Sequence, residues 1–176
     1  MADEAIVVVP YDPEWPRRFV AESELLERVL APWLEGGIHH IGATSVPGLA
    51  AKPIVDMMAG VRDLEEARAA FDPLLEQSYL YSPHRPGIAH HFFKPSLRLL
   101  SVTYGLHLTE SGSDLWRERL GFRDAVRADP TLAAEYEALK YRLAAQHRDD
   151  IGAYTAGKRA FVARVLESAG MQPGRR

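Results

Sequence analysis

Residues 38–58 read IHHIGATSVPGLAAKPIVDMM, and this stretch decides the fold. The short apolar run from Ile38 to Ile41 predicts a strand that ends at Gly42, where a turn of small residues follows. From Pro53 to Val61 the chain is almost wholly apolar, as expected of a strand covered on both faces. We expect these two strands to be neighbours in a sheet, so that the turn and Asp56 line one pocket.

Periodic patterns on both sides of this stretch predict the other elements. They are a strand over Ala5–Val9, a helix between Trp15 and Trp33, a helix capped by Asp63 with Glu66, strands near His90–Lys94 and Leu97–Leu108, and three helical stripes between Ser113 and Leu166. The order predicts an α/β or α+β fold, in which a mixed sheet with helices precedes a helical C-terminal half.

Length and composition limit the classes of protein that this chain can belong to. Its 176 residues predict a single domain over residues 1–170 and a frayed tail over residues 171–176. The absence of cysteine excludes disulfides, thiolate metal sites and a cysteine nucleophile. No apolar run approaches the roughly 20 residues that span a bilayer, and the N-terminus lacks a signal-peptide pattern, so we expect a cytoplasmic protein without membrane contact. A formal charge of −3 argues against broad nucleic-acid binding.

The turn after Gly42 has the residues of an anion-binding loop. Glycine allows a sharp turn and close approach of a ligand, and the backbone N–H groups and hydroxyls of Thr44 and Ser45 can hold a phosphate. The alternative is ordinary turn and helix-cap chemistry, in which the same hydroxyls bind the chain itself.

Asp56 is a carboxylate in an apolar strand, and its burial is costly unless a cation or hydrogen-bond donors meet it. A metal held by Asp56 with His40 and His107 is one hypothesis, since two imidazoles and a carboxylate suit zinc, manganese or iron. The alternatives are a salt bridge from Asp56 to Lys52 or an arginine, and histidines that are hydrogen-bonded separately.

The segment from His40 to Asp56 resembles the signature of the GrpB family (UPF0157), a set of mostly uncharacterised bacterial proteins. The opening Val9-Pro10-Tyr11-Asp12-Pro13-Glu14-Trp15-Pro16 resembles the N-terminus of that family. The helical end of the family is similar to Gly121-Phe122-Arg123-Asp124, to Leu139-Lys140, and to Tyr154 with Lys158. The likeness therefore covers nearly the whole chain.

The resemblance implies a nucleotidyltransferase-like fold, whose motif is a strand, Gly-Gly or Gly-Ser, a helix, and Asp-x-Asp on the next strand. Asp56 matches the first acid, fourteen residues after Gly42, but Met58 stands in the place of the second acid. Ala43 replaces the serine usual in the family, and Gly105-Leu106-His107 replaces a His-x-His. We find no candidate for a third acid between Leu97 and Leu108.

These observations predict a protein that binds a nucleotide or another phosphorylated small molecule and transfers a nucleotidyl or phosphoryl group. The alternative is a degenerate domain that binds such a ligand without chemistry, and a hydrolase or nuclease ranks third. The predicted residues are Asp56, His107 and Lys52 for catalysis, Gly42, Thr44, Ser45, Arg123 and Lys158 for the phosphorylated ligand or cofactor, and Asp56, His40 and His107 for a divalent metal (Mg, Mn or Zn).

The arginines of the first C-terminal helix allow two interpretations. Arg119, Arg123 and Arg127 recur at i, i+4 and i+8 and therefore share one face. This face can point toward an anionic ligand, or it can be a solvated surface paired with neighbouring acids. The P-loop and Rossmann fingerprints are absent, and so is the Gly-x-Ser-x-Gly motif of hydrolases.

Overall fold

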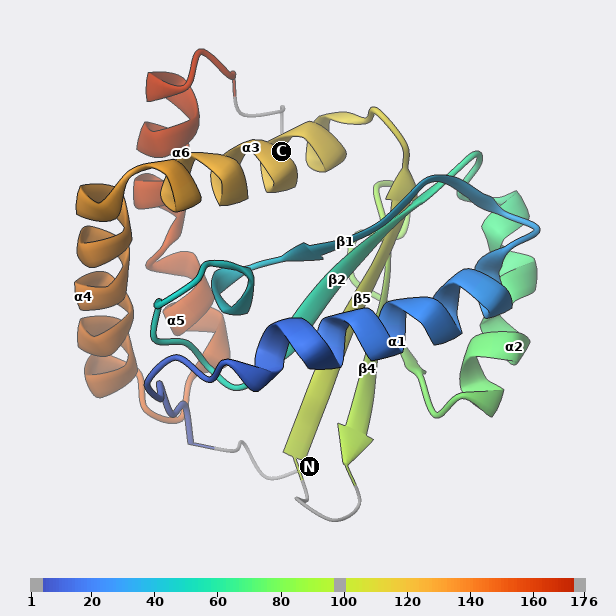
Figure 1. The fold of residues 1–176 in the computed structure, drawn as a ribbon, viewed down its shortest axis with the longest axis horizontal. Helices are drawn as coiled ribbons and strands as arrows, with labels where there is room; N and C mark the ends of the chain where they lie inside the picture. Colours follow the sequence, from blue (N-terminus) through green and yellow to red (C-terminus); the bar gives the residue numbers. More distant parts are fainter. Residues whose placement is uncertain (1–4, 97–100, 173–176) are drawn as a thin grey trace.

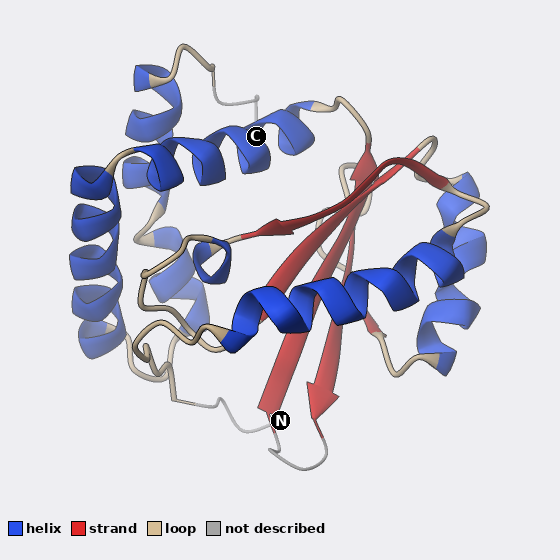
Figure 2. Cartoon of the chain, in the orientation of Figure 1, coloured by secondary structure: helices blue, strands red, loops and turns tan. Residues whose placement is uncertain are grey.

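A five-stranded mixed sheet forms the centre of the protein, with helices on both sides (Figures 1 and 2). The structure, a computed structural model, describes residues 5–96 and 101–172. The strand order is β1-β2-β5-β4-β3, and only the pair of β2 and β5 is parallel. The described elements are α1 (Glu14–Leu30), β1 (Leu34–Ile41), η1 (Ala43–Ser45), β2 (Val55–Val61), η2 (Glu66–Ala70), α2 (Phe71–Glu76), β3 (Leu80–Ser82), β4 (His90–Ser96), β5 (Ser101–Glu110), α3 (Asp114–Ala128), α4 (Pro130–Gln146), α5 (Ile151–Ala156) and α6 (Arg159–Ser168).

The two strands predicted from residues 38–58 are neighbours, as expected. β1 and β2 pair antiparallel with Ile41 opposite Asp56, and on the other side of β2 the same aspartate faces Gly105 of β5. The turn between β1 and β2 is the 3₁₀ helix η1, and Gly42 before it has a φ of 72°, a conformation that favours glycine. The motif is thus held in the middle of the sheet.

The two faces of the sheet differ because successive strand residues point to opposite sides. Val55, Met57 and Ala59 of β2 lie in a buried apolar cluster that also contains Trp15 and Leu26 of α1. This face is covered by α1, which crosses the sheet in Figure 1, and by α2. The intervening residues of β2, which include Asp56, therefore point to the opposite face.

The helical C-terminal half has its own core. It joins residues of α3, α4 and α6 to the loop after η1, and its buried members are Val46, Leu49, Val126, Tyr136, Phe161 and Val165. Asp129 caps α4 by accepting from the N–H groups of Thr131 and Leu132, and Pro130 occupies the first turn as predicted. The helices α3 to α6 lie together on one side of the sheet in Figure 1.

Several predicted elements differ from the structure. The Ala5–Val9 segment forms only an isolated bridge, between Val9 and Ala51, because Pro10 ends it before a strand can pair. The three-residue strand β3 was not predicted, and the last helical stripe is divided into α5 and α6. Residues 97–100 of an expected strand and residues 173–176 of the expected tail lie outside the described residues. Within the described residues, no helix has the length and apolarity needed to span a membrane.

Candidate functional site

The carboxylate of Asp56 lies between two glycines, Gly42 directly after β1 and Gly105 of β5. A Cβ atom at Gly42 would lie 3.0 Å from Asp56 Oδ2, and one at Gly105 would overlap Oδ1. Both positions therefore depend on having no side chain. The sheet thus provides a fitted space for one carboxylate at the start of β2.

Three cations from separate segments act on this carboxylate. They are Arg119 of α3, Lys158 between α5 and α6, and Lys52 before β2. Burial raises the pKa of Asp56 from 3.8 to about 6, although all three cations oppose the shift. Burial likewise lowers the pKa of Lys158 from 10.5 to about 8, where Asp56 opposes the shift and Lys52 and Arg119 add to it. Desolvation therefore dominates at both groups.

A cleft of about 470 Å³ opens beside this cluster, a volume typical of small-molecule sites. One side of α3 forms a wall from Asp114 to Phe122, which at 1.5 Å per residue is about 12 Å long. Gly42 and Tyr136 also line the cleft, together with Lys158. Four basic residues line the cleft, Arg85, Arg119, Lys158 and Arg159, and so do three acidic residues, Glu110, Asp114 and Glu118.

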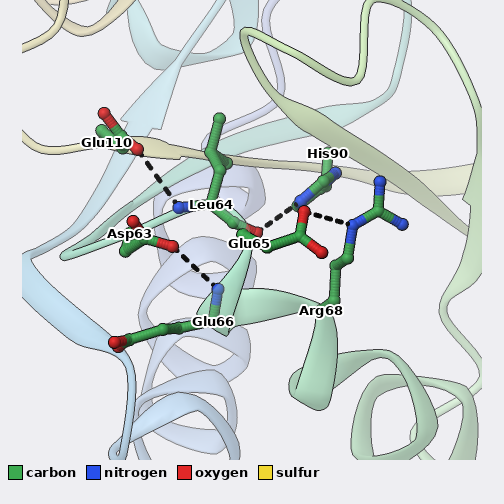
Figure 3. A network of polar contacts seen from close by, with 7 residues as sticks. All are labelled: Asp63, Leu64, Glu65, Glu66, Arg68, His90 and Glu110. Carbon is green, nitrogen blue, oxygen red and sulfur yellow. Dashed lines mark hydrogen bonds and ion pairs between the residues drawn. The ribbon is translucent and has the colours of Figure 1, made fainter.

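A polar network fixes the wall of the cleft near Glu110 (Figure 3). The backbone N–H of Leu64 donates to Glu110 Oε1 at 3.3 Å, and the Leu64 carbonyl lies 2.8 Å from His90 Nε2. Asp63 caps the next turn by accepting from the Glu66 N–H, as the sequence predicted. Glu110 is thus engaged in holding the loop after β2.

Three histidine rings contact one another in a row that begins at His84, which lines the cleft. The ring centroids of His91 and His107 are 4.4 Å apart, and those of His84 and His91 are 5.5 Å apart. Burial lowers the pKa of His91 to about 4 and that of His107 well below its usual range. The Nδ1 atom of His107 is buried and has no hydrogen-bond partner among the described residues. These two imidazoles are therefore neutral at neutral pH.

His107 shares a sheet face with Asp56, but His40 does not, so the predicted convergence of His40, Asp56 and His107 is wrong. His40 pairs with Met57 rather than with Asp56 and stacks on Phe19 of α1, with centroids 4.9 Å apart. Burial lowers its pKa to about 4. The register of β1 therefore assigns His40 to the core beneath α1.

The predicted cradle of hydroxyl groups is also wrong. Thr44 and Ser45 are only 2% and 4% exposed. The Thr44 hydroxyl donates to the Ile54 carbonyl and, because it has a single proton, accepts from His40 Nε2 at 2.9 Å. The Ser45 hydroxyl donates to the Gly42 carbonyl. Both hydroxyls stabilise the turn, which is the alternative that the sequence left open.

Arg123 and Arg127 reinforce the same turn from α3. Arg123 Nη1 donates to the His40 carbonyl and its Nε to Asp124, while Arg127 Nε donates to the Ser45 carbonyl. Of the arginines on this helix face, Arg119 alone lines the cleft, one to two turns before the other two. Among the five residues predicted to bind the phosphorylated ligand, Gly42 and Lys158 line the cleft.

A magnesium site of the Asp-x-Asp kind does not fit these residues. Met58, at the position of the second acid, is fully buried. Residues 5–96 and 101–172 contain no group of three or more His, Asp or Glu side chains that could hold a metal ion. Hard cations require several oxygen ligands, and Asp56 offers one carboxylate among cations.

The sequence interpretation left the role of Arg119 open and missed three contributors to the site: Tyr136, Gly105 and His91 as the partner of His107. The shared face of Arg119, Arg123 and Arg127 was visible in the sequence, but its orientation was not. The sequence also showed that Gly105 replaces the first histidine of the His-x-His pattern of the family. No sequence signal indicated that the missing side chain makes room for Asp56.

Comparisons with known proteins agree with this fold. A sequence model described as GrpB protein matches residues 5–168. The UPF0157 protein YqkA of Bacillus subtilis is 37% identical over 93% of this chain, but the match spans 47% of YqkA. The glutamate-rich protein GrpB of Alkalihalophilus pseudofirmus is 33% identical over 92% of this chain and 94% of its own length.

Solved structures show the same architecture. The conserved protein GrpB from Enterococcus faecalis matches with a TM-score of 0.83 and 29% identity, over 93% of this chain and 96% of that one. The Cid1 poly(U) polymerase in its MgGTP-bound form matches with a TM-score of 0.51 and 13% identity, over 81% of this chain and 44% of that one. The fold is therefore nucleotidyltransferase-like, as expected.

Proposed function

The chain belongs to the GrpB family, and we propose that it binds a nucleotide or another phosphorylated small molecule in the cleft beside Asp56. The observation that carries this proposal is the excess of positive charge around Asp56, where two of the three cations, Arg119 and Lys158, also line the cleft. Lys158, Arg119 and Lys52 act on the single carboxylate of Asp56, and charges that are partly removed from water favour an anionic partner.

The dimensions of the cleft support a ligand of nucleotide size. A volume of about 470 Å³ and a wall about 12 Å long exceed what one phosphate requires. Aliphatic side chains of Leu64, Ile88, Leu115 and Val162 line the cleft beside the cations and can accommodate an apolar part of the ligand. Cid1, which shares this fold, has been solved in an MgGTP-bound form, which is consistent with this ligand class.

Transfer of a nucleotidyl or phosphoryl group is a second candidate function. Asp56 and Lys158 are neighbours with pKa values of about 6 and about 8, so both can exchange protons near neutral pH. Met58 in place of the second acid favours binding without chemistry instead. A cytoplasmic location stays a prediction.

Calorimetric titration tests the proposed binding, with inorganic pyrophosphate, ATP and UTP as probes. We expect saturable binding by the parent protein and at least about tenfold weaker binding by Lys158→Met. Arg28→Met is the matched control, because it removes one positive charge from the exposed surface of α1. No binding of any probe, or equal losses in both variants, would contradict the proposal.

A further inference from the structure

The charges around Asp56 are those of an anion site rather than a cation site. Three cationic side chains, from the loop before β2, from α3 and from the turn between α5 and α6, act on one carboxylate. When all four groups are ionised, the cluster carries two net positive charges. A divalent cation that entered it would be repelled by two ammonium groups and a guanidinium, and this repulsion is strong where water is partly excluded.

The same sheet face offers few oxygen ligands to compensate. Asp56 is followed on this face by Met58, which pairs with His107 of β5, and the strand position beside Asp56 is Gly105. Magnesium usually keeps several waters and takes one or two carboxylates together with the phosphates of a substrate. Here one carboxylate is available at that point, and its neighbours are cations.

We propose that the cleft binds its phosphorylated ligand directly, without a divalent metal, through the ammonium group of Lys158 and the guanidinium of Arg119, which line the cleft, with Lys52 adding positive charge beside Asp56. The inference rests on the proposed function. Lysine binds phosphate as a point charge and arginine as a two-pronged donor, so the three side chains can supply the charge that a bridging metal would otherwise supply.

Direct binding has a consequence that distinguishes it from metal-bridged binding. Magnesium complexes of pyrophosphate or ATP carry less negative charge than the free anions, so they are attracted less strongly to a positive cluster. The site should therefore prefer the metal-free anion. A metal-bridged site has the opposite preference, because its carboxylate meets the phosphate only through the ion.

The experiment is calorimetric titration of pyrophosphate and of ATP into the 176-residue chain, in EDTA and then with Mg²⁺, Mn²⁺ or Zn²⁺ in excess. We expect binding in EDTA, and affinities about threefold or more weaker with excess Mg²⁺. Binding that is absent in EDTA and restored by any of the three metals would overturn the inference while leaving the proposed function intact. Absence of binding under every condition would instead refute the proposed function.

Two substitutions sharpen the test. Asp56→Asn removes the negative charge with little change of shape, so direct binding predicts tighter binding of pyrophosphate in EDTA. Weaker binding by this variant in excess Mg²⁺ would indicate a metal ligand and overturn the inference. Lys158→Arg keeps the charge and should retain most of the affinity that Lys158→Met loses. Circular dichroism and thermal unfolding establish that each variant is folded before titration.

Discussion

At the scale of single residues, Asp56 shows how a sheet can hold a carboxylate that gains little stability from its position. Its side chain occupies the space left by Gly42 and Gly105, and burial raises its pKa to about 6. A carboxyl group whose pKa is higher in the folded chain than in the unfolded chain binds its proton more tightly when folded. The protonated side chain therefore favours the folded chain at low pH, and this contribution to the free energy of unfolding is lost as the pH rises through about 6.

Asp56→Asn should accordingly remove a pH-dependent cost. Near pH 7 we expect the variant to be at least as stable as the parent, by up to about 3 kcal/mol, and near pH 4 we expect the two stabilities to converge. Urea unfolding at both pH values measures the difference. A large loss of stability near pH 7 would show that Asp56 belongs to a permanent ion pair and is a structural residue.

The residue scale is also where prediction from the sequence reached its limit. Two adjacent histidines must point to opposite faces of a strand, but the register of β1 decides that His40 faces α1. Thr44 and Ser45 have the composition of an anion loop, yet their hydroxyls find backbone acceptors within ten residues. Side-chain type indicated which residues matter, whereas tertiary contacts decided what they touch.

At the scale of elements, α4 holds the loop that leads from η1 to β2. Glu137 Oε2 accepts from the Ala50 N–H at 2.7 Å, and Lys140, which is 1% exposed, donates to the Ala50 carbonyl. Both backbone polar groups of one buried residue are thereby satisfied by a helix about 90 residues away in sequence. Lys52 follows Ala50 by two residues in this loop, so α4 also positions a cation of the site.

Glu137→Ala tests this contact, and Glu135→Ala on the same helix is its control. Both changes replace Glu by Ala in a helix, but Glu135 makes an exposed ion pair with Arg164, which contributes about 0–1 kcal/mol. Loss of the charged acceptor should leave the Ala50 N–H unsatisfied and cost about 1.5–3 kcal/mol. Chemical denaturation compares the two variants. Equal losses would show that the bond to Ala50 adds nothing beyond a surface contact.

Long periodic elements were predictable because helices and buried strands carry many consistent positions. The helix over Glu14–Leu30 and the strand over Val55–Val61 match their patterns to within three residues. β3 has three residues and therefore no period to detect. Gly157 and Lys158 separate α5 from α6, and a single glycine within a helical pattern does not predict a break. The cleft itself was beyond the sequence, since its lining residues range from Gly42 to Val162.

At the scale of the whole molecule, the cleft lies where two cores meet. One core joins the sheet to α1 and α2, and the other joins α3, α4 and α6 to the loop after η1. Asp56 and Lys52 come from the side of the sheet, while Arg119 and Lys158 come from the helical half. A ligand that contacts all three cations must therefore connect the two halves.

Hydrogen exchange should reveal this connection. Opening motions that separate the halves expose backbone amides near the cleft, and a ligand that binds only the closed form suppresses them in proportion to its occupancy. With saturating pyrophosphate we expect slower exchange over residues 43–56 and 154–162, and little change in α1, whose contacts lie on the opposite sheet face. Lys158→Met should abolish the protection at equal pyrophosphate concentration. Protection confined to one half, or equally strong in α1, would mean that the ligand does not join the two cores at this cleft.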